Sequence, residues 1–320
     1  MNKVMMINGS ASPIKCGVGY YGEMLVPELS KYNTVNLLTT EGLGKDGEGA
    51  SETYHIANWK IRQIPKITSI IKNSKSNVVH IQYPAKGYKR ELGINLLPLW
   101  LRVFNRKLPI LVTLHEYHES AGLGKIRNLL TVFFAHKIIV SNKLDMDSLP
   151  KILRKKIAVI TIGSTMKSYP RNRKAYESFM STAGLSASKP TLAYFGFINP
   201  NKGLETLINA SRDINAQILV LAALNNDNPY HRKVSDLVND AKNSGAKLYI
   251  AGFLDNELVS QIMQECLFFV LSQPLPLTAK SSTAIVATQN GLPVVSKSSV
   301  DAQYNYPYIN NKNAILLDNM

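Results

Sequence analysis

The chain has 320 residues, about twice the length of a typical domain, and the composition of an ordinary globular protein, so we expect two domains. The apolar run nearest the N-terminus, Val4 to Ile7, is too short for the core of a signal peptide, and no apolar run approaches membrane-spanning length. Cys16 and Cys266 suggest neither a disulfide framework nor a zinc site. We therefore expect a cytoplasmic protein without a metal centre.

The net charge of +15 is concentrated in the first half of the chain. Residues 1–170 contain 24 Lys plus Arg against 11 Asp plus Glu, whereas residues 171–320 contain 13 against 11. A basic half suits an anionic partner such as a phospholipid surface, a phosphorylated acceptor or a nucleic acid. No helix-turn-helix, zinc or RNP-like pattern accompanies the charge, so we expect no nucleic-acid partner.

The first half alternates apolar, β-rich runs with helical segments, which predicts a parallel sheet covered on both sides. The expected strands are Val4–Asn8, Val35–Thr39, Val78–Gln82, Leu111–Leu114, Ile138–Val140 and Ala158–Ile162. Polar residues follow these strands and would form a cleft at one sheet edge; among them are Gln82, Tyr83, His115 and Glu116. His115, Glu116 and His118 could suggest a metal, but no third ligand is identifiable, so we expect them to form hydrogen bonds.

A glycine-containing loop, Gly9 to Gly19, follows the first expected strand. Gly17 and Gly19 would let the backbone approach a ligand closely. They do not complete a GxGxxG motif, and no acidic residue on a following strand could hold a ribose, so a dinucleotide site is disfavoured. A plain strand-to-helix turn explains the loop at least as well.

The segment Lys86 to Lys107 combines an apolar stretch containing Trp100 and Phe104 with basic flanks. A helix of this kind can rest on an anionic bilayer. It can equally be a crossover helix packed on the sheet with its basic side in water. We expect membrane contact only from the basic flanks.

The segment from Met166 to Pro190 is polar and contains prolines and a glycine, which predicts a linker at 171–190 between an N-terminal domain, 1–170, and a C-terminal domain, 191–320. A second series of strands and helices begins at Thr191. Its expected strands are Leu192–Phe195, Ile218–Leu221, Leu248–Ile250, Leu267–Leu271, Pro293–Val295 and Ala314–Leu317.

The stretch Thr191 to Ala210 contains a strand, a loop and a helix. The strand stops at Gly196, and the loop carries Lys202 before Gly203. Such a loop brings a cation and backbone N–H groups to the carboxyl end of a strand, where a phosphate would be held. The alternative is an ordinary turn with a solvated Lys202.

Two later turns also suggest a ligand. Lys280 precedes three hydroxyl residues, Ser281, Ser282 and Thr283, at the start of an expected helix, and this combination would bind a diphosphate well. Simple helix capping accounts for one of these hydroxyls. The turn Gly252, Phe253 and Leu254 could face a planar base or could be structural.

Taken in order, these segments resemble the two-domain GT-B glycosyltransferases, specifically family 4 of the nucleotide-sugar-dependent enzymes. The matching stretches are CGVGYYGEML, HIQYP, VTLHE, IIVS, YFGFINPNKGLETLINA, IAGFLDNELVSQIM and GLPVV. They fall in the family's order and at its usual separations over nearly the whole chain. The resemblance implies two Rossmann-like, doubly wound parallel-sheet domains that face a cleft.

The resemblance also implies roles for individual residues. A UDP- or GDP-linked sugar would bind the second domain, where Lys202 neutralises the donor diphosphate without an obligatory metal or other cofactor. Gly17 and Gly19 would close on the sugar phosphates, His115 would lie near the transferred sugar, and the turn at Gly252 would meet the nucleobase.

Several positions depart from the family pattern. Phe197 follows Gly196 where the family usually carries an Arg, so Lys280 would have to supply the second cation. The usual pair of glutamates would align with Thr278 and Val286, and both acids are absent. The sequence stops at Met320, just past the last expected strand, so we expect a shortened C-terminus.

The leading hypothesis is a glycosyltransferase, retaining by resemblance, that acts on a cell-surface polysaccharide or lipid-linked glycan precursor at the cytosolic face of a membrane. The basic N-terminal domain would dock on anionic lipid. The alternative is a degenerate, non-catalytic subunit that serves as a binding or scaffold partner.

Overall fold

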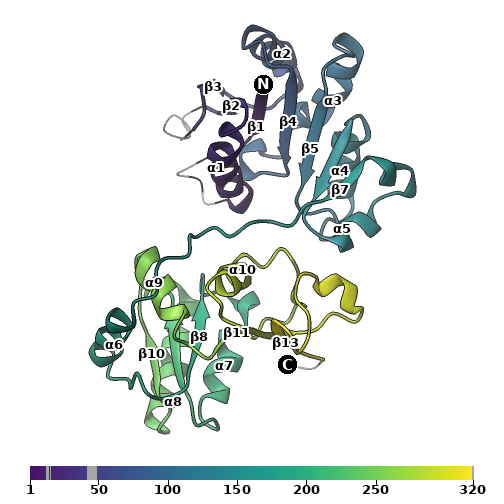
Figure 1. The fold of residues 1–320 in the computed structure, drawn as a ribbon. Helices are drawn as coiled ribbons and strands as arrows, with labels where there is room; N and C mark the ends of the chain where they lie inside the picture. Colours follow the sequence, from purple (N-terminus) through teal and green to yellow (C-terminus); the bar gives the residue numbers. More distant parts are fainter. Residues whose placement is uncertain (12–13, 15, 42–48, 319–320) are drawn as a thin grey trace. The chain divides into compact units, whose positions relative to one another are not determined.

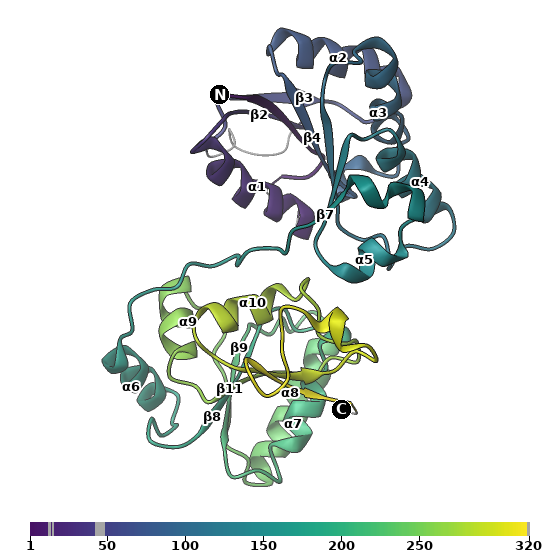
Figure 2. The same ribbon diagram turned by 45° about the vertical axis from the view of Figure 1, so that its right-hand side comes forward.

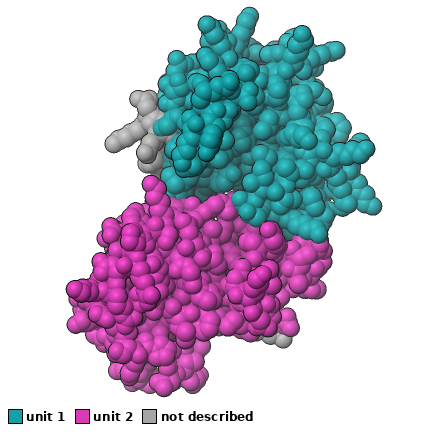
Figure 3. All heavy atoms as spheres, in the orientation of Figure 1, with its two compact units in different colours: residues 1–161 teal, residues 162–320 magenta. Residues whose placement is uncertain are grey.

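The structure is a computed structural model that describes residues 1–11, 14, 16–41 and 49–318. Residues 12, 13 and 15 of the predicted Gly9–Gly19 loop lie outside this description. The chain divides into two compact units, unit 1 at residues 1–161 and unit 2 at residues 162–320 (Figure 3). Residues 162–190, which include the expected linker, therefore belong to unit 2. In the described residues no helix is long and apolar enough to cross a bilayer.

Unit 1 is built on a seven-stranded parallel sheet with the order β3-β2-β1-β4-β5-β6-β7 (Figure 1). The strands are β1 Lys3–Asn8, β2 Thr34–Thr40, β3 Glu52–Ile56, β4 Val78–Tyr83, β5 Ile110–Leu114, β6 Lys137–Val140 and β7 Ile157–Val159. All six predicted strands are present, although β7 is shorter than expected. The sequence analysis missed β3, because this edge strand is partly exposed and carries no continuous apolar run.

Helices cover both faces of the first sheet. They are α1 Gly17–Ser30, α2 Ile64–Asn73, α3 Gly93–Phe104, α4 Leu123–Phe133 and α5 Lys143–Ser148, with 3₁₀ turns at Ile61–Gln63, Lys86–Tyr88 and Lys151–Lys156. Side chains along β1 point alternately to the two faces of the sheet. Met5 and Ile7 pack with α2, α3 and α4 on one face, whereas Val4 and Met6 pack with α1 on the other. Pro65 lies in the first turn of α2, where a proline is tolerated.

Unit 2 repeats this architecture on a six-stranded parallel sheet with the order β10-β9-β8-β11-β12-β13. The strands are β8 Thr191–Phe195, β9 Gln217–Leu221, β10 Leu248–Ile250, β11 Phe268–Leu271, β12 Val294–Lys297 and β13 Ala314–Leu317. The helices are α6 Arg173–Thr182, α7 Leu204–Ala210, α8 Pro229–Asn243, α9 Asn256–Met263 and α10 Ser282–Gln289, with 3₁₀ turns at Pro200–Lys202 and Ala302–Asn305. All six strands expected in this half are confirmed.

The helices of unit 2 also form two layers. Helices α6, α9 and α10 bury side chains with one face of the sheet, and α7 and α8 pack on the other (Figure 2). The strand order reverses once in each sheet, between β1 and β4 in unit 1 and between β8 and β11 in unit 2. Ligands of open parallel sheets bind beyond the carboxyl ends of the strands at such a switch point.

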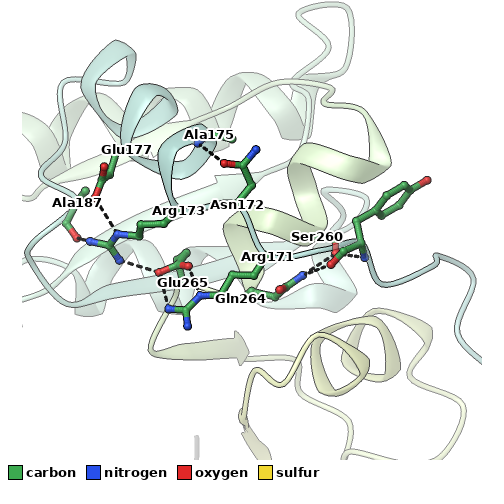
Figure 4. Close-up of polar contacts among 10 residues, drawn as sticks. Arg171, Asn172, Arg173, Ala175, Glu177, Ala187, Ser260, Gln264 and Glu265 are labelled. Atoms are coloured by element: carbon green, nitrogen blue, oxygen red, sulfur yellow. Dashed lines mark hydrogen bonds and ion pairs between the residues drawn. The ribbon is translucent and has the colours of Figure 1, made fainter.

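A buried carboxylate attaches the expected linker segment to unit 2 (Figure 4). The Glu265 side chain is 1% exposed and accepts from Arg171 Nη2 at 3.1 Å and from Arg173 Nη1 at 2.7 Å. Gln264 Nε2 donates to the Tyr169 carbonyl at 2.9 Å. Residues preceding α6 are therefore anchored to the end of α9.

We expect Glu265→Gln to lower the free energy of unfolding by about 2 kcal/mol at pH 7, because charge-assisted hydrogen bonds are lost. Hydrogen bonds from Arg171 and Arg173 lower the pKa of the Glu265 carboxyl below its ordinary value. The stability that the ionised Glu265 contributes is therefore present above the pKa that this carboxyl has in the unfolded chain. It is lost as the pH falls through the lower pKa of the folded protein. Urea unfolding at several pH values measures both effects.

The matched control is Glu177→Gln, because Glu177 also pairs with Arg173 but is 51% exposed. It should cost about 0.5 kcal/mol or less. Equal effects of the two substitutions would contradict the assignment of Glu265 as the anchor.

Candidate functional site at the switch point of unit 2

Two loops meet at the switch point of unit 2, one after β8 and one after β11. Ser272 Oγ donates a hydrogen bond of 2.6 Å to the Gly203 carbonyl. Gly203 has a φ of +65°, and a Cβ placed on it would lie 1.8 Å from the Ser272 carbonyl oxygen. Only glycine allows both the left-handed backbone and this close approach.

A second contact joins the same elements. Gly196, at the end of β8, has a φ of +124°, and a Cβ placed on it would lie 2.8 Å from Thr283 Cγ2 in α10. Gly196 and Gly203 therefore bracket a loop that packs closely against the β11–α10 segment. This segment carries Lys280 and the three hydroxyl residues.

Lys202 is half-buried on the β8–α7 loop. Burial lowers the pKa of its ammonium group below the ordinary value, because desolvation disfavours the charged form. Within the described parts of the chain no carboxylate forms an ion pair with it. An anion that reached this loop would offset the cost of desolvation.

The start of α10 leaves its hydroxyl groups available for other partners. Ser281 precedes the helix but its side chain makes no capping hydrogen bond, contrary to the expectation that capping would use one hydroxyl. Thr283 Oγ1 is buried and has no hydrogen-bond partner in the described structure. Ser282 and Lys280 are half-buried on the same segment. Whether the side chains of Lys202 and Lys280 share one ligand stays a prediction.

His231, on α8, holds the Lys202 loop from a third element. Its Nε2 lies 2.9 Å from the Ile198 carbonyl oxygen, and its Nδ1 accepts from the Asn225 amide at 2.8 Å. With Nδ1 accepting, the proton lies on Nε2 and is donated to Ile198. The sequence contained no signal for this role, because helix α7 and strand β9 separate His231 from the loop along the chain.

The β10–α9 turn has an exposed aromatic ring at its tip. Gly252 has a φ of +76° and open space around its Cβ position, and Phe253 is 93% exposed. Leu254 instead packs partly against the core. Of the three residues predicted to meet a base, Phe253 presents the most surface.

Among the described residues at the switch point of unit 1, the space next to Gly9 is filled by a side chain. A Cβ on Gly9 would lie 2.4 Å from the Tyr88 ring, and a Cβ on Gly87 would lie 1.5 Å from the Gly9 carbonyl oxygen. Tyr88 is 2% exposed and donates to the Gln82 carbonyl at 2.9 Å. The Tyr88 ring therefore occupies the position next to Gly9.

The glycines predicted to contact the donor belong to α1. The helix begins at Gly17, three residues earlier than expected, so Gly17 and Gly19 lie in its first turn. Gly19 is buried, and its Cβ position lies 3.0 Å from the Ser10 carbonyl oxygen, which gives it a packing role. Gly17 is exposed with open space around it.

Of the residues predicted to line an acceptor cleft, two are buried. Gln82 is 0% exposed and Tyr83 is 6% exposed, whereas a residue that lines a cleft would be open to solvent. The strand alternation alone could not show this, because both faces of the sheet are covered. Glu116 is exposed after β5, and His115 is 9% exposed beside it.

The described residues contain no group of three His, Cys, Asp or Glu side chains arranged to hold a metal ion. His118 instead places Nδ1 at 3.1 Å from Ser148 Oγ, and its amide donates to Asp145 at 2.8 Å.

No protein-family model and no curated protein sequence matches the chain. Solved structures do match. Anabaena Alr3699/HepE in complex with UDP-glucose is 14% identical, with a TM-score of 0.66 over 93% of this chain and 81% of that chain. Sucrose-phosphate synthase from Thermosynechococcus elongatus is 17% identical, with a TM-score of 0.61 over 93% and 81%.

WaaG, described as a glycosyltransferase involved in lipopolysaccharide biosynthesis, is 12% identical, with a TM-score of 0.56 over 92% of this chain and 80% of that chain. At these identities the likeness concerns the fold. Together with the two parallel sheets, it shows that the chain has the GT-B fold of two Rossmann-like domains.

We expect Gly203→Ala to destabilise the protein by about 2 kcal/mol more than Gly245→Ala, because its Cβ would overlap the Ser272 carbonyl. Gly245 is a matched control, since it has a φ of +93° and nothing within 4 Å of its Cβ position. Chemical unfolding of both variants measures the difference. Equal losses would mean that the contact between the two loops is not tight.

Proposed function

We propose that this protein is a glycosyltransferase that moves a sugar from a UDP- or GDP-linked donor to a polysaccharide or lipid-linked glycan precursor. The GT-B fold and two of its structural neighbours support the reaction class, since WaaG is a glycosyltransferase and HepE was solved with UDP-glucose. Unit 2 holds the donor nucleotide, because its switch point is built from the loops that carry Lys202 and Ser281.

One observation carries this proposal. The half-buried ammonium group of Lys202 has no carboxylate partner in the described chain, and its loop packs against an element whose buried Thr283 hydroxyl also has no partner there. A buried cation and a buried hydroxyl without partners both cost free energy. A diphosphate supplies acceptor oxygens to both groups.

The same groups account for the chemistry. When the bond between the anomeric carbon and the phosphate oxygen breaks, its electron pair leaves with the nucleotide diphosphate. The acceptor hydroxyl oxygen bonds to the anomeric carbon, and its proton passes to the departing diphosphate or to water. Positive charge from Lys202 and Lys280, and the N–H groups at the start of α10, stabilise this developing charge. The proposal assigns neutralisation of the diphosphate to these residues without an obligatory metal, and retention of configuration follows the family resemblance.

For the acceptor we propose a lipid-linked glycan at the cytoplasmic face of a membrane, reached through the basic unit 1. Helix α3 buries Ile94, Leu97 and Leu101, so these apolar residues belong to the core, as expected of a crossover helix packed on the sheet. Its last turn behaves differently, because Val103 is 54% exposed and Phe104 is 65% exposed.

Exposed cations surround this end of α3. Arg102, Arg106 and Lys107 are all exposed and lie within five residues of Phe104. Apolar side chains flanked by cations suit the interface of an anionic bilayer. Each well-placed cation contributes about 1 kcal/mol to the free energy of membrane binding.

A second candidate is a non-catalytic binding or scaffold subunit. It is favoured by the absence of acids at Thr278 and Val286, and Val286 is fully buried in the core of unit 2. Such a subunit would bind nucleotide without transferring or hydrolysing the sugar.

We expect UDP or GDP to raise the thermal stability of the wild-type protein, because the ligand binds only the folded form. Lys202→Ala should abolish this shift and lower kcat for donor hydrolysis or transfer by about 100-fold. The matched control is Lys242→Ala, an exposed lysine in the last turn of α8. Identical behaviour of the two variants would refute the phosphate site, and nucleotide binding without turnover would identify the scaffold alternative.

We also expect the protein to bind vesicles containing phosphatidylglycerol more tightly than vesicles of phosphatidylcholine, with an affinity that falls as salt rises. The double substitution Arg106→Glu and Lys107→Glu should weaken binding at least about tenfold. Lys242→Glu with Lys247→Glu, in unit 2, makes the same change of charge elsewhere. A vesicle flotation assay in which both pairs act alike would exclude α3 as the contact.

A further inference from the structure

Three basic side chains, which we call the basic cluster, gather at the edge of the first sheet opposite its switch point. Arg102 lies in the last turn of α3, His136 directly precedes β6, and Lys156 directly precedes β7. Strands β5, β6 and β7 are parallel neighbours, so their amino ends share this edge. Ligands of open parallel sheets bind at the carboxyl ends, so a site here is separate from the one that the fold predicts.

The His136 ring lies between two donors. Arg102 Nη1 is 2.7 Å from His136 Nε2, and the Ile110 amide nitrogen is 3.0 Å from His136 Nδ1. A guanidinium group and a backbone N–H can only donate, whereas a neutral imidazole has a single nitrogen with a free lone pair. The ring can therefore accept from one of these two groups and must direct an N–H at the other. The basic cluster is short of one hydrogen-bond acceptor.

The basic cluster is also short of negative charge. Among residues 1–11, 14, 16–41 and 49–318, no carboxylate forms an ion pair with Arg102, His136 or Lys156. Desolvation and the charges of Arg102 and Lys156 lower the pKa of His136 below its ordinary value, so its ring is neutral at pH 7. An anion at this edge would supply both the missing acceptor and the missing charge.

A structural role explains only one member of the basic cluster. Lys156 Nζ donates to the carbonyls of Phe133 and Ala135, at 3.0 Å and 3.1 Å, and so caps the end of α4. An ammonium group has three hydrogens, so this cap leaves one of them for another acceptor. Capping gives no reason for Arg102 to face the ring of His136.

Exposed aromatic rings lie beside the basic cluster. Phe133 is 49% exposed, and its ring centroid is 6.0 Å from Lys156 Nζ. Phe104, two residues after Arg102, is 65% exposed, and its ring centroid is 4.2 Å from that of Trp100. Helices α3 and α4, which carry these rings, pack side by side (Figure 2). Rings next to cations suit the interface of a bilayer, whereas a small soluble anion would gain nothing from them.

We propose that the basic cluster binds the terminal phosphate of a lipid head group, a phosphomonoester. With this phosphate bound, His136 Nδ1 accepts from the Ile110 amide, and Nε2–H donates to a phosphate oxygen. Arg102 and the remaining hydrogen of Lys156 donate to the other oxygens. The inference rests on the membrane contact in the proposed function and deepens it, because it names the head group that unit 1 recognises.

The number of oxygens favours a phosphomonoester over a phosphodiester. A phosphomonoester carries about −1.5 to −2 charges at pH 7 and has three strong acceptor oxygens, one for each member of the basic cluster. A phosphodiester has a single negative charge and only two such oxygens. General attraction to an anionic surface makes no such distinction, since it depends on the charge of the surface.

Vesicles matched for surface charge test the proposal. We expect the protein to bind phosphatidylcholine vesicles that contain phosphatidic acid about tenfold more tightly than vesicles of equal surface potential that contain phosphatidylglycerol. Arg102→Gln should remove this preference and leave the weaker, charge-dependent binding. Its melting temperature should match that of the wild type, because Arg102 is exposed and forms no ion pair in the described chain.

The matched control is Arg106→Gln, which removes the same charge from an exposed arginine near the same end of α3 but outside the basic cluster. It should weaken binding to both kinds of vesicle alike. A wild type without the preference, or a preference that both substitutions remove, would overturn the proposal. Equal binding to the two anionic vesicles, above that to phosphatidylcholine alone, would overturn it while leaving the membrane contact of the proposed function intact. Binding to neither would refute both.

A second measurement tests the phosphate site without a membrane. In proton–nitrogen NMR of histidine-labelled chain, glycerol 3-phosphate should shift the ring signals of His136 saturably, whereas NaCl of the same ionic strength should not. The signals are assigned by their loss in His136→Gln, and Arg102→Gln should abolish the saturation. A wild type without a saturable shift would overturn the site. Saturable binding of glycerol 3-phosphate without a preference for phosphatidic acid would overturn the assignment to a lipid.

Discussion

The close approach of Gly203 to Ser272 is the constraint on which the candidate site depends. A hydrogen bond of 2.6 Å joins the Ser272 hydroxyl to the Gly203 carbonyl, and no side chain larger than hydrogen fits between the two segments. This contact brings the loop after β8 against the loop after β11. Without it, Lys202 and the start of α10 would belong to separate parts of the sheet edge.

The two units share a topology but differ where their strand order reverses. In unit 1 the ring of Tyr88 occupies the position beside Gly9, and the neighbouring Gln82 and Tyr83 are buried. In unit 2 the corresponding place carries a half-buried cation and a hydroxyl that the described chain leaves without partners. The two units therefore preserve the sheet while the loops at the switch point differ.

Half-buried and buried polar side chains hold their neighbours in place in the two units. In unit 2, His231 ties the Lys202 loop to α8, and in unit 1, Gln82 connects His80 with His115. Such contacts leave few orientations to the groups that they hold. A preorganised site of this kind loses less conformational entropy when a ligand binds.

The sequence by itself determined both parallel sheets, all their strands except β3, and the turns that hold Lys202 and Lys280, because apolar periodicity and glycine placement are local properties. It did not reveal that Gln82 and Tyr83 are buried, that Gly17 and Gly19 begin a helix, or that Ser281 makes no cap. Nor did it show the role of His231. Those outcomes depend on which residues distant in the chain become neighbours, and only the tertiary structure decides that.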